Sequence, residues 1–158
     1  MKTLKCKTVI GGVARGPAMV TKQPINFTAA MCKVPNMMPS KRAEVRDAHH
    51  ELFKQNIAGQ VLVFPSCIGS THTGLVLLDL VSQKRGPAAL IVQHNDSLLI
   101  SGVVLSEVWF GETIPVVEYP GDDLFEHIRN GDAVEVDGEA AEIRINVGQL
   151  WGQSKGTE

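Results

Sequence analysis

Hydroxyl groups and one imidazole gather in residues 66–73, which read Ser-Cys-Ile-Gly-Ser-Thr-His-Thr. If a helix starts here, free backbone N–H groups and the positive end of the helix dipole lie beside Ser70, Thr71, His72 and Thr73. Such a spot suits an anion, for example a carboxylate or a phosphate. A turn rich in Ser and Thr that only caps a helix has the same composition, so the spacing leaves both interpretations open.

The flanking residues predict the elements that position this turn. Residues 61–64 are Val, Leu, Val and Phe, which indicates a buried strand, and Pro65 ends it because proline has no N–H for the sheet ladder. Residues 75–83 indicate a helix that closes at the cations and glycine of residues 84–86. The apolar run 88–92 then predicts a central strand, and strand, helix and strand in this order predict a parallel crossover.

The rest of the chain predicts further strands and helices. Residues 4–10 and 17–21 read as a hairpin-like pair of strands around Gly11-Gly12, and residues 31–40 as an irregular loop that serves either as an interface or as a cover over the core. The C-terminal half predicts a helix over 98–110 capped at 95–97, a strand over 114–118, a helix from 122 to 128, and a solvent-facing hairpin of 133–137 with 141–145.

Residues 41–48 predict a short helix, and four possible metal ligands, Asp47, His49, His50 and Glu51, lie at or beyond its end. Adjacent histidines on a helix point about 100° apart and do not easily share one metal. We therefore expect a solvated, charged face here and no metal site in this chain.

The three cysteines, Cys6, Cys32 and Cys67, are an odd number and lie far apart in the chain. This favours a reducing cytoplasm over a disulfide framework. The clustered spacing of an iron–sulfur site is missing, so Cys6 and Cys32 are best explained as small buried residues. Cys67 belongs to the hydroxyl-rich turn and could lie near a ligand.

Composition excludes several classes of protein. A chain of 158 residues with 44% hydrophobic and 20% charged residues is typical of one globular domain. A net charge of −2 gives no basic footprint for nucleic acid, and no apolar run is long enough to cross a membrane. The first eight residues have no apolar core of a secretory signal.

The expected layout is an α/β fold with a central β/α core and flanking β hairpins. Residues 1–150 are expected to form one domain and residues 151–158 a polar tail. No second catalytic constellation is readable, since the sequence contains no Ser-His-Asp order and no glycine-rich phosphate loop of the usual spacing.

The stretch 64–78, Phe-Pro-Ser-Cys-Ile-Gly-Ser-Thr-His-Thr-Gly-Leu-Val-Leu-Leu, resembles the signature of the small subunit, or swivelling domain, of the aconitase X family. Residues 16–20, 24–27, 59–63, 86–91 and 114–117 also fit, so the resemblance covers about residues 11 to 119. It implies a swivelling β/β/α domain that works with a large subunit. That subunit would carry an iron–sulfur cluster and most of the active site of a hydroxy-acid dehydratase.

The resemblance implies a catalytic role for Ser70 as the base that takes the proton next to the substrate carboxylate. It places Gly69, Thr71, His72, Thr73, Phe27 and Thr28 around the substrate.

Members of the family that resemble this chain act on cis-3-hydroxy-L-proline, giving a pyrroline-2-carboxylate, or on phosphomevalonate. The common motif reads Gly-Arg-Gly-Ser-Ser, whereas this chain has Cys-Ile-Gly-Ser-Thr at 67–71. Replacement of the arginine by Ile68 removes a cation that could bind a phosphate bidentately. The hydroxyproline type is therefore expected, with phosphomevalonate as the alternative.

Two other classes fit parts of the sequence. Thr71-His72 at a helix start also resembles the phosphohistidine swivelling domain, in which His72 would carry a phosphoryl group. A binding or scaffold domain without catalytic residues is the third possibility.

Overall fold

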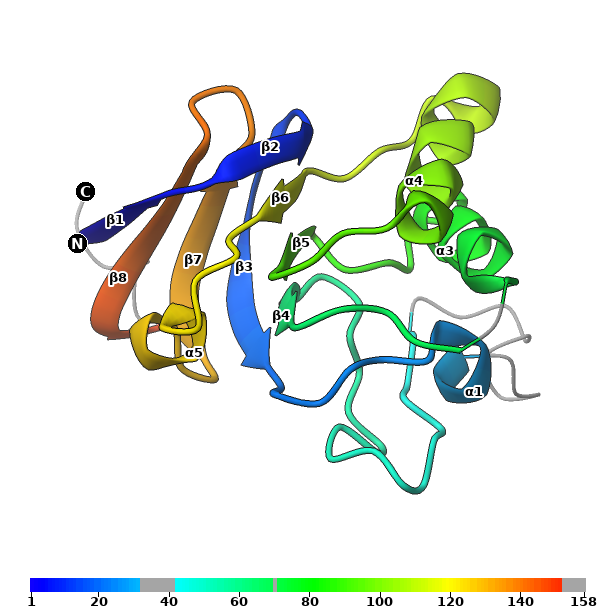
Figure 1. Cartoon of the computed structure of the whole chain (residues 1–158), viewed down its shortest axis with the longest axis horizontal. Coiled ribbons are helices and arrows are strands. Elements are labelled where there is room, and N and C mark those ends of the chain that lie inside the picture. The colour runs from blue at the N-terminus through cyan, green and yellow to red at the C-terminus, as the bar shows by residue number, and fades with distance from the viewer. Residues whose placement is uncertain (32–41, 70, 152–158) are drawn as a thin grey trace.

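The computed structural model describes residues 1–31, 42–69 and 71–151, with the side chains of 147–150 left aside. Strands and helices alternate through the middle of the chain, with further strands at both ends (Figure 1). The strands are β1 (Lys2–Lys5), β2 (Lys7–Ile10), β3 (Val13–Val20), β4 (Val61–Phe64), β5 (Ala89–Val92), β6 (Val116–Glu118), β7 (Asp132–Asp137) and β8 (Glu142–Leu150). The described helices are α1 (Phe27–Met31), α3 (Thr73–Ser82), α4 (Ser97–Phe110) and α5 (Leu124–His127).

All the described strands form one sheet in the order β1-β8-β7-β3-β4-β5-β6-β2. Its two ends, β1 and β2, are halves of one extended segment that is interrupted at Cys6, where the backbone N–H donates to the carbonyl of Ala141 at 3.0 Å. β1 pairs with β8 and β2 with β6, so this segment joins the two edges and the sheet closes on itself. The same segment therefore covers one side of β8 and one side of β6.

The expected hairpin-like pair of 4–10 with 17–21 is wrong. β3 pairs antiparallel with β7 and parallel with β4, and β2 pairs with β6 instead. Gly11-Gly12 allows a tight turn, but the partner of each strand is chosen by long-range contacts that local turn residues do not encode.

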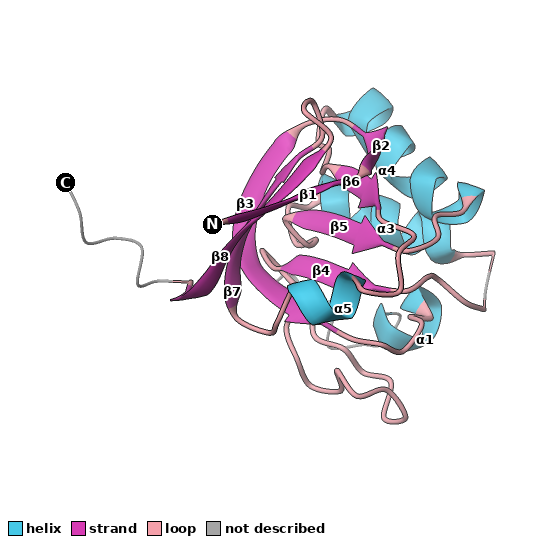
Figure 2. Ribbon diagram, turned by 60° about the vertical axis from the view of Figure 1, so that its left-hand side comes forward, coloured by secondary structure: helices cyan, strands magenta, loops and turns pink. Residues whose placement is uncertain are grey.

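The two central strands are wholly buried, as their apolar sequences predict, and they lie parallel. Alternate residues face two cores: Leu62 and Phe64 point to the helices, whereas Val61 and Val63 point to the core against β7 and β8. Helices α1, α3 and α4 lie on one side of the sheet and α5 lies apart from them (Figures 1 and 2). This arrangement confirms the expected α/β fold.

The predicted C-terminal elements form with shifted limits. Asp96 caps α4, because its carboxylate accepts from the backbone N–H of Leu99 at 2.9 Å. β7 and β8 form the predicted hairpin, but it does not lie at an edge of the sheet, since β1 covers β8 and β3 covers β7.

The predicted helix over 41–48 is wrong for its described part. Residues 42–57 form an irregular hairpin in which the backbone N–H of Val45 donates to Gln55 and that of Lys54 donates back to Val45, both at 2.8 Å. Ala43 and Val45 are buried with Glu44 between them, a period of two that is typical of extended chain. The sequence pattern at this short segment was therefore ambiguous, and tertiary burial decided it.

The four possible metal ligands of this region take part in the hairpin turn. The Asp47 carboxylate accepts from the backbone of His49, and the Nδ1 atom of His50 accepts from Leu52. The Glu51 carboxylate accepts from the Lys22 backbone at 3.2 Å. Within the described residues, no three His, Cys, Asp or Glu side chains are grouped to hold a metal ion. The predicted loop at 31–40 lies outside the described residues after Met31.

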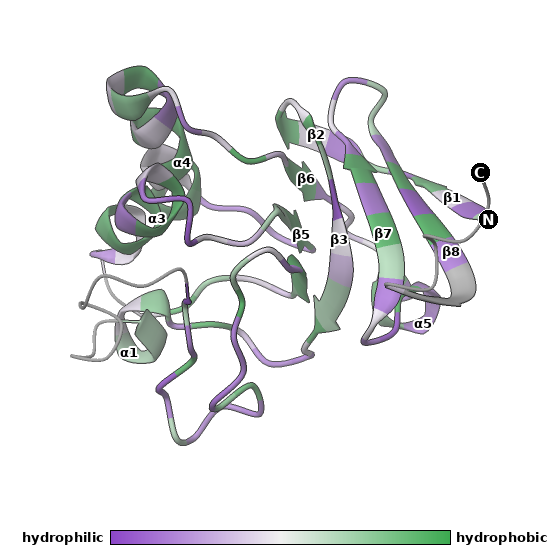
Figure 3. Cartoon of the chain, turned by 180° about the vertical axis from the view of Figure 1, so that it is seen from behind, coloured by the Kyte–Doolittle hydropathy of each residue, from purple (hydrophilic) through white to green (hydrophobic). Residues whose placement is uncertain are grey.

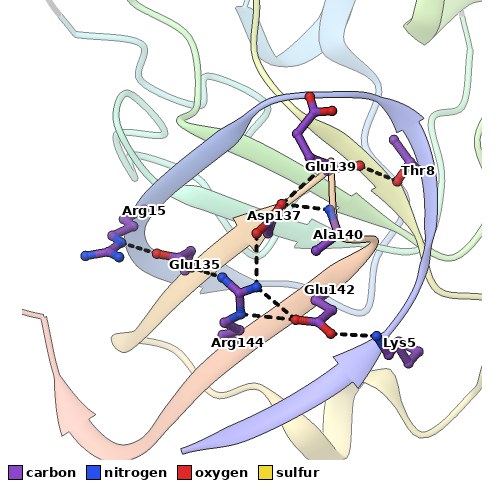
Figure 4. Close-up of polar contacts among 10 residues, drawn as sticks. Lys5, Thr8, Arg15, Glu135, Asp137, Glu139, Ala140, Glu142 and Arg144 are labelled. Atoms are coloured by element: carbon purple, nitrogen blue, oxygen red, sulfur yellow. Dashed lines mark hydrogen bonds and ion pairs between the residues drawn. The ribbon is translucent and has the colours of Figure 1, made fainter.

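The outer face of the sheet carries a network of ion pairs around one arginine (Figure 4). The Arg144 guanidinium lies 2.9 Å from the Glu142 carboxylate and 3.0 Å from the Asp137 carboxylate. Lys5 and Arg15 extend it from β1 and β3. The members are Lys5, Arg15, Glu135, Asp137, Glu142 and Arg144.

Hydrogen bonds lower the pKa of carboxyl groups in this network. For Glu142 the lowered pKa results first from the hydrogen bond donated by Lys5 and then from the bond donated by Arg144. For Asp137 the backbone N–H of Ala140 lowers the pKa most, followed by Arg144. This face is therefore charged and suited to water.

Candidate functional site

The carboxyl ends of four parallel strands meet at one edge of the sheet. β3, β4, β5 and β6 run parallel to one another, so the segments that follow them lie along the same edge. Ligands of α/β proteins bind in the crevice outside such carboxyl ends. The hydroxyl-rich turn follows β4 and therefore belongs to this edge (Figure 1).

The start of the turn is fastened to the segment before α1. The backbone N–H of Ile25 donates to Ser66, and that of Ile68 donates to Ile25, both at 3.0 Å. These bonds make a parallel bridge between Ile25 and Cys67. Residues 66–68 of the turn are therefore held by strand-like backbone hydrogen bonds, although they lie outside the strands.

Gly69 is the point where the loop bends. Its φ is +91°, a conformation that L side chains rarely adopt, and a Cβ there would lie 2.3 Å from the side-chain nitrogen of Asn26. Asn26 is itself fixed, because its side-chain oxygen accepts from the Ala29 backbone N–H at 3.1 Å at the start of α1. Asn26 therefore supports the loop, a role that the sequence reading missed although an Asn before a helix is a known capping signal.

The predicted site residues separate into exposed and buried groups. Gly69, Thr71 and His72 are exposed, whereas Thr73 is buried. His72 is the N-cap residue of α3 and its own side chain makes no cap hydrogen bond, so whether a Ser or Thr of the turn caps this helix stays a prediction. Ser70 lies outside the described residues.

The two predicted site residues on α1 lie beneath the loop. Phe27 has an exposed fraction of 0% and packs edge-on against Phe64, with ring centroids 5.9 Å apart. Thr28 is partly buried, and its hydroxyl has no hydrogen-bond partner among the described residues. In this chain Phe27 is thus a core contact, and the substrate-binding roles of both residues stay predictions.

The first turn of α3 is fixed by close contact with α4. A Cβ on Gly74 would lie 2.9 Å from the carbonyl oxygen of Leu98, and a Cβ on Gly102 would lie 2.3 Å from the carbonyl oxygen of Gly74. Only two glycines allow the backbones to approach so closely. A glycine inside a predicted helix, here Gly74 and Gly102, indicates a possible close helix contact, but the sequence does not show which helices meet.

Neighbouring loops complete the edge. After β5, the backbone N–H of Asn95 donates to the Glu118 carboxylate at 2.9 Å, and the Gln93 side chain donates to Gly121 at 3.2 Å. A cavity of about 350 Å³ opens there, lined by residues that include Lys22, Gln93 and Asp122. The lining includes the positively charged Lys22 and the negatively charged Asp122. No motif in the sequence predicted this cavity.

The two described cysteines lie in separate parts of the fold. Cys6 interrupts the first strand segment and Cys67 lies in the turn, and both are free. Burial raises the pKa of the Cys6 thiol to about 11, and the charge of Glu142 adds to this. Burial, assisted by Asp96, also raises the pKa of Cys67 well above its usual range. Both described thiols are therefore protonated at neutral pH, and Cys32 lies outside the described residues.

The first turn of α3 offers donors rather than a complete catalytic set. Backbone N–H groups at this helix start, the exposed Thr71 hydroxyl and the exposed His72 ring can bind or orient an anion. These donors are groups that can bind and orient a substrate, and the predicted base, Ser70, stands in the sequence directly before them.

Most of the chain is similar in sequence to known proteins of one family. Residues 3–145 match the aconitase X swivel domain family. The phosphomevalonate dehydratase small subunit of Methanothrix thermoacetophila is 35% identical over 112 residues, which cover 71% of this chain and 77% of that protein. The subunit of the same name from Methanosarcina mazei is 30% identical over 151 residues, covering 96% of this chain and 95% of that protein.

The fold agrees as well. The crystal structure of Thermococcus kodakaraensis aconitase X in its holo-form superimposes with a TM-score of 0.76 at 28% identity, covering 92% of this chain and 98% of that chain. The resemblance seen in the turn at 64–78 is thus confirmed for the family as a whole. The chain belongs to the aconitase X swivel domain family.

Proposed function

We propose that this chain is the small subunit of an aconitase X-type hydro-lyase that removes water from a 3-hydroxy acid together with a large subunit. The family match over residues 3–145 carries this proposal, because the matching relatives are named dehydratase small subunits. The same names favour a dehydratase over a phosphohistidine domain or a scaffold domain. The donor-rich edge around α3 supports a shared active site.

Ser70 is proposed as the base. Dehydration of a 3-hydroxy acid removes the proton on the carbon next to the carboxylate and releases the hydroxyl group from carbon 3. A serine hydroxyl is a weak base by itself, so its alkoxide needs stabilisation, and backbone N–H groups at the start of α3 are available for this. The assignment depends on the family resemblance and on the bend at Gly69, which directs the chain from the fastened part of the loop towards α3.

Loss of the hydroxyl group requires an acid or a metal, and we propose that the large subunit supplies it. We expect the iron–sulfur cluster of this enzyme in that subunit, as the family resemblance implies, and Cys6 and Cys67 pack against two different cores of this chain. Two free thiols also support our proposal that the protein works in a reducing cytoplasm.

Phosphomevalonate is the substrate that the relatives favour over the hydroxyproline expected from the sequence. Subunits named for phosphomevalonate match this chain at 27–35% identity. One observation favours cis-3-hydroxy-L-proline as a second candidate: Ile68 is 52% exposed at the rim of the turn, where an arginine could have bound a phosphate. Both substrates are 3-hydroxy acids, so the same base would serve either.

The proposal is tested by mixing the purified chain with the large subunit of the same organism and assaying both substrates. We expect dehydration of one substrate by the complex and none by the chain alone. Ser70→Ala should abolish turnover while the complex still forms, whereas Ser82→Ala at the far end of α3 should leave turnover unchanged. Turnover by the isolated chain would contradict the proposal, and near-normal turnover by Ser70→Ala would refute the assignment of the base.

A further inference from the structure

Helix α4 is apolar around most of its circumference, and its single charged residue is Glu107 (Figure 3). One side packs on the core through Leu99 and Val103. On the outer side Val108 is 71% exposed and Trp109 is 62% exposed. The exposed polar residues of α4 are Ser97, Ser101 and Glu107, and large exposed apolar side chains beside them are typical of a protein-interaction surface.

This apolar surface begins at the candidate site. Ile68 in the turn, Leu75 in the first turn of α3 and Leu98 at the start of α4 are exposed. The glycine contact holds the starts of α3 and α4 together, so Leu75 and Leu98 lie at the same corner of the molecule, and Ile68 belongs to the turn that leads into α3. We define the docking surface as Ile68, Leu75, Leu98, Val104, Val108 and Trp109.

The opposite face of the molecule differs in character. The outer side of the sheet carries the ion-pair network around Arg144, whose carboxylates are stabilised in their charged form (Figure 4). Charged residues are depleted at the centres of protein interfaces, and apolar and aromatic residues are enriched. Of these two faces, the helical face is the one suited to a permanent partner.

We propose that the large subunit binds the docking surface along α4, so that the same contact closes the active site and positions the turn. This inference rests on the proposed function. A site completed by the large subunit requires that subunit to reach the rim at Ile68, Leu75 and Leu98, and the apolar surface continues from there along α4 without a charged residue except Glu107. A second copy of this chain on the same surface would cover the rim and exclude the large subunit.

The test compares two valine-to-lysine variants. Val108 lies in the docking surface, and Val13 is an exposed valine of 57% exposure at the start of β3, outside that surface. We expect Val108→Lys to raise the Kd for the large subunit at least tenfold, equivalent to about 1.4 kcal/mol, and Val13→Lys to leave it unchanged. Trp109→Ala should weaken binding as well, because exposed tryptophans in such surfaces are common hot spots.

Calorimetric titration of the purified large subunit gives the affinities, and thermal unfolding of each variant verifies that it is folded. Equal affinity of wild type and Val108→Lys would overturn the inference, as would a failure of the wild-type chain to bind. A dimer of this chain that Val108→Lys dissociates would show that a second copy is the occupant, which also overturns it. If the wild-type complex forms through α4 but dehydrates neither substrate, the proposed function fails while the docking surface stands.

Discussion

The contact between α3 and α4 predicts a large effect of one methyl group. Gly102→Ala adds a Cβ 2.3 Å from the carbonyl oxygen of Gly74, so the helices must separate by about 1 Å to reach the 3.4 Å of an ordinary contact. Overpacking costs about 1–3 kcal/mol, and the upper end applies because the obstacle is main chain that cannot rotate away. Alanine regains about 1 kcal/mol of helix propensity, so the expected net loss is about 2 kcal/mol.

A loss of that size lowers the Tm of a chain of this length by about 4–8 °C. Turnover of the complex should fall as well, because the first turn of α3 moves relative to the loop that carries Ser70. Ser101→Ala is the matched control, since it changes the adjacent residue of α4 and adds no atom at the contact. Thermal unfolding and the dehydration assay measure both effects. A Gly102→Ala variant as stable as the wild type would refute the idea that glycines set this helix spacing.

Three further predictions follow from the described contacts. Gly69→Ala should reduce turnover more than Gly59→Ala, because both positions have positive φ (+91° and +73°) but only Gly69 meets another side chain; equal activities would contradict this. Arg144→Met should lower the free energy of unfolding at pH 7, measured by urea unfolding. The difference in this free energy from wild type should narrow as the pH falls below the ordinary carboxyl pKa values of 3.8 and 4.5, because lowered folded-state pKa values stabilise the fold only while the carboxyls are ionised. A difference that persists in acid would argue against this. Asp79→Leu should lower the free energy of unfolding by about 2 kcal/mol in the same assay, because the buried Arg85 guanidinium loses a carboxylate 3.0 Å away. The double variant Asp79→Leu/Arg85→Met should recover part of this loss.

The turn and the central strands could be predicted from the sequence because their signals are local. Four apolar residues in a row, a proline that ends the ladder, and a carboxylate before α4 act within a few residues of one another. The family signature at 64–78 is local as well, because it consists of consecutive residues. The substrate type stays a prediction, because a single exchange at Ile68 does not show which groups of a partner surround the substrate.

The failures have a common physical cause. The partner of β3, the closure of the sheet by the segment around Cys6, and the hairpin at 42–57 all depend on residues far apart in the chain. The sequence around Ala43 and Val45 is compatible with a helix, but burial of these two side chains favours the extended conformation. Local propensity is worth a few tenths of a kcal/mol per residue, so such burial outweighs it.

By itself, then, the sequence determined the α/β core, the cap of α4 at Asp96 and the position of the hydroxyl-rich turn after β4, because each depends on neighbouring residues. Only the tertiary structure decided that Asn26 lies under Gly69, that Gly74 meets Gly102, and that the outer side of α4 is left uncovered. These features arise from contacts between separate elements, and no spacing along one element encodes them. The turn therefore becomes one side of a site only when the loop before α1 and the start of α4 hold it in place.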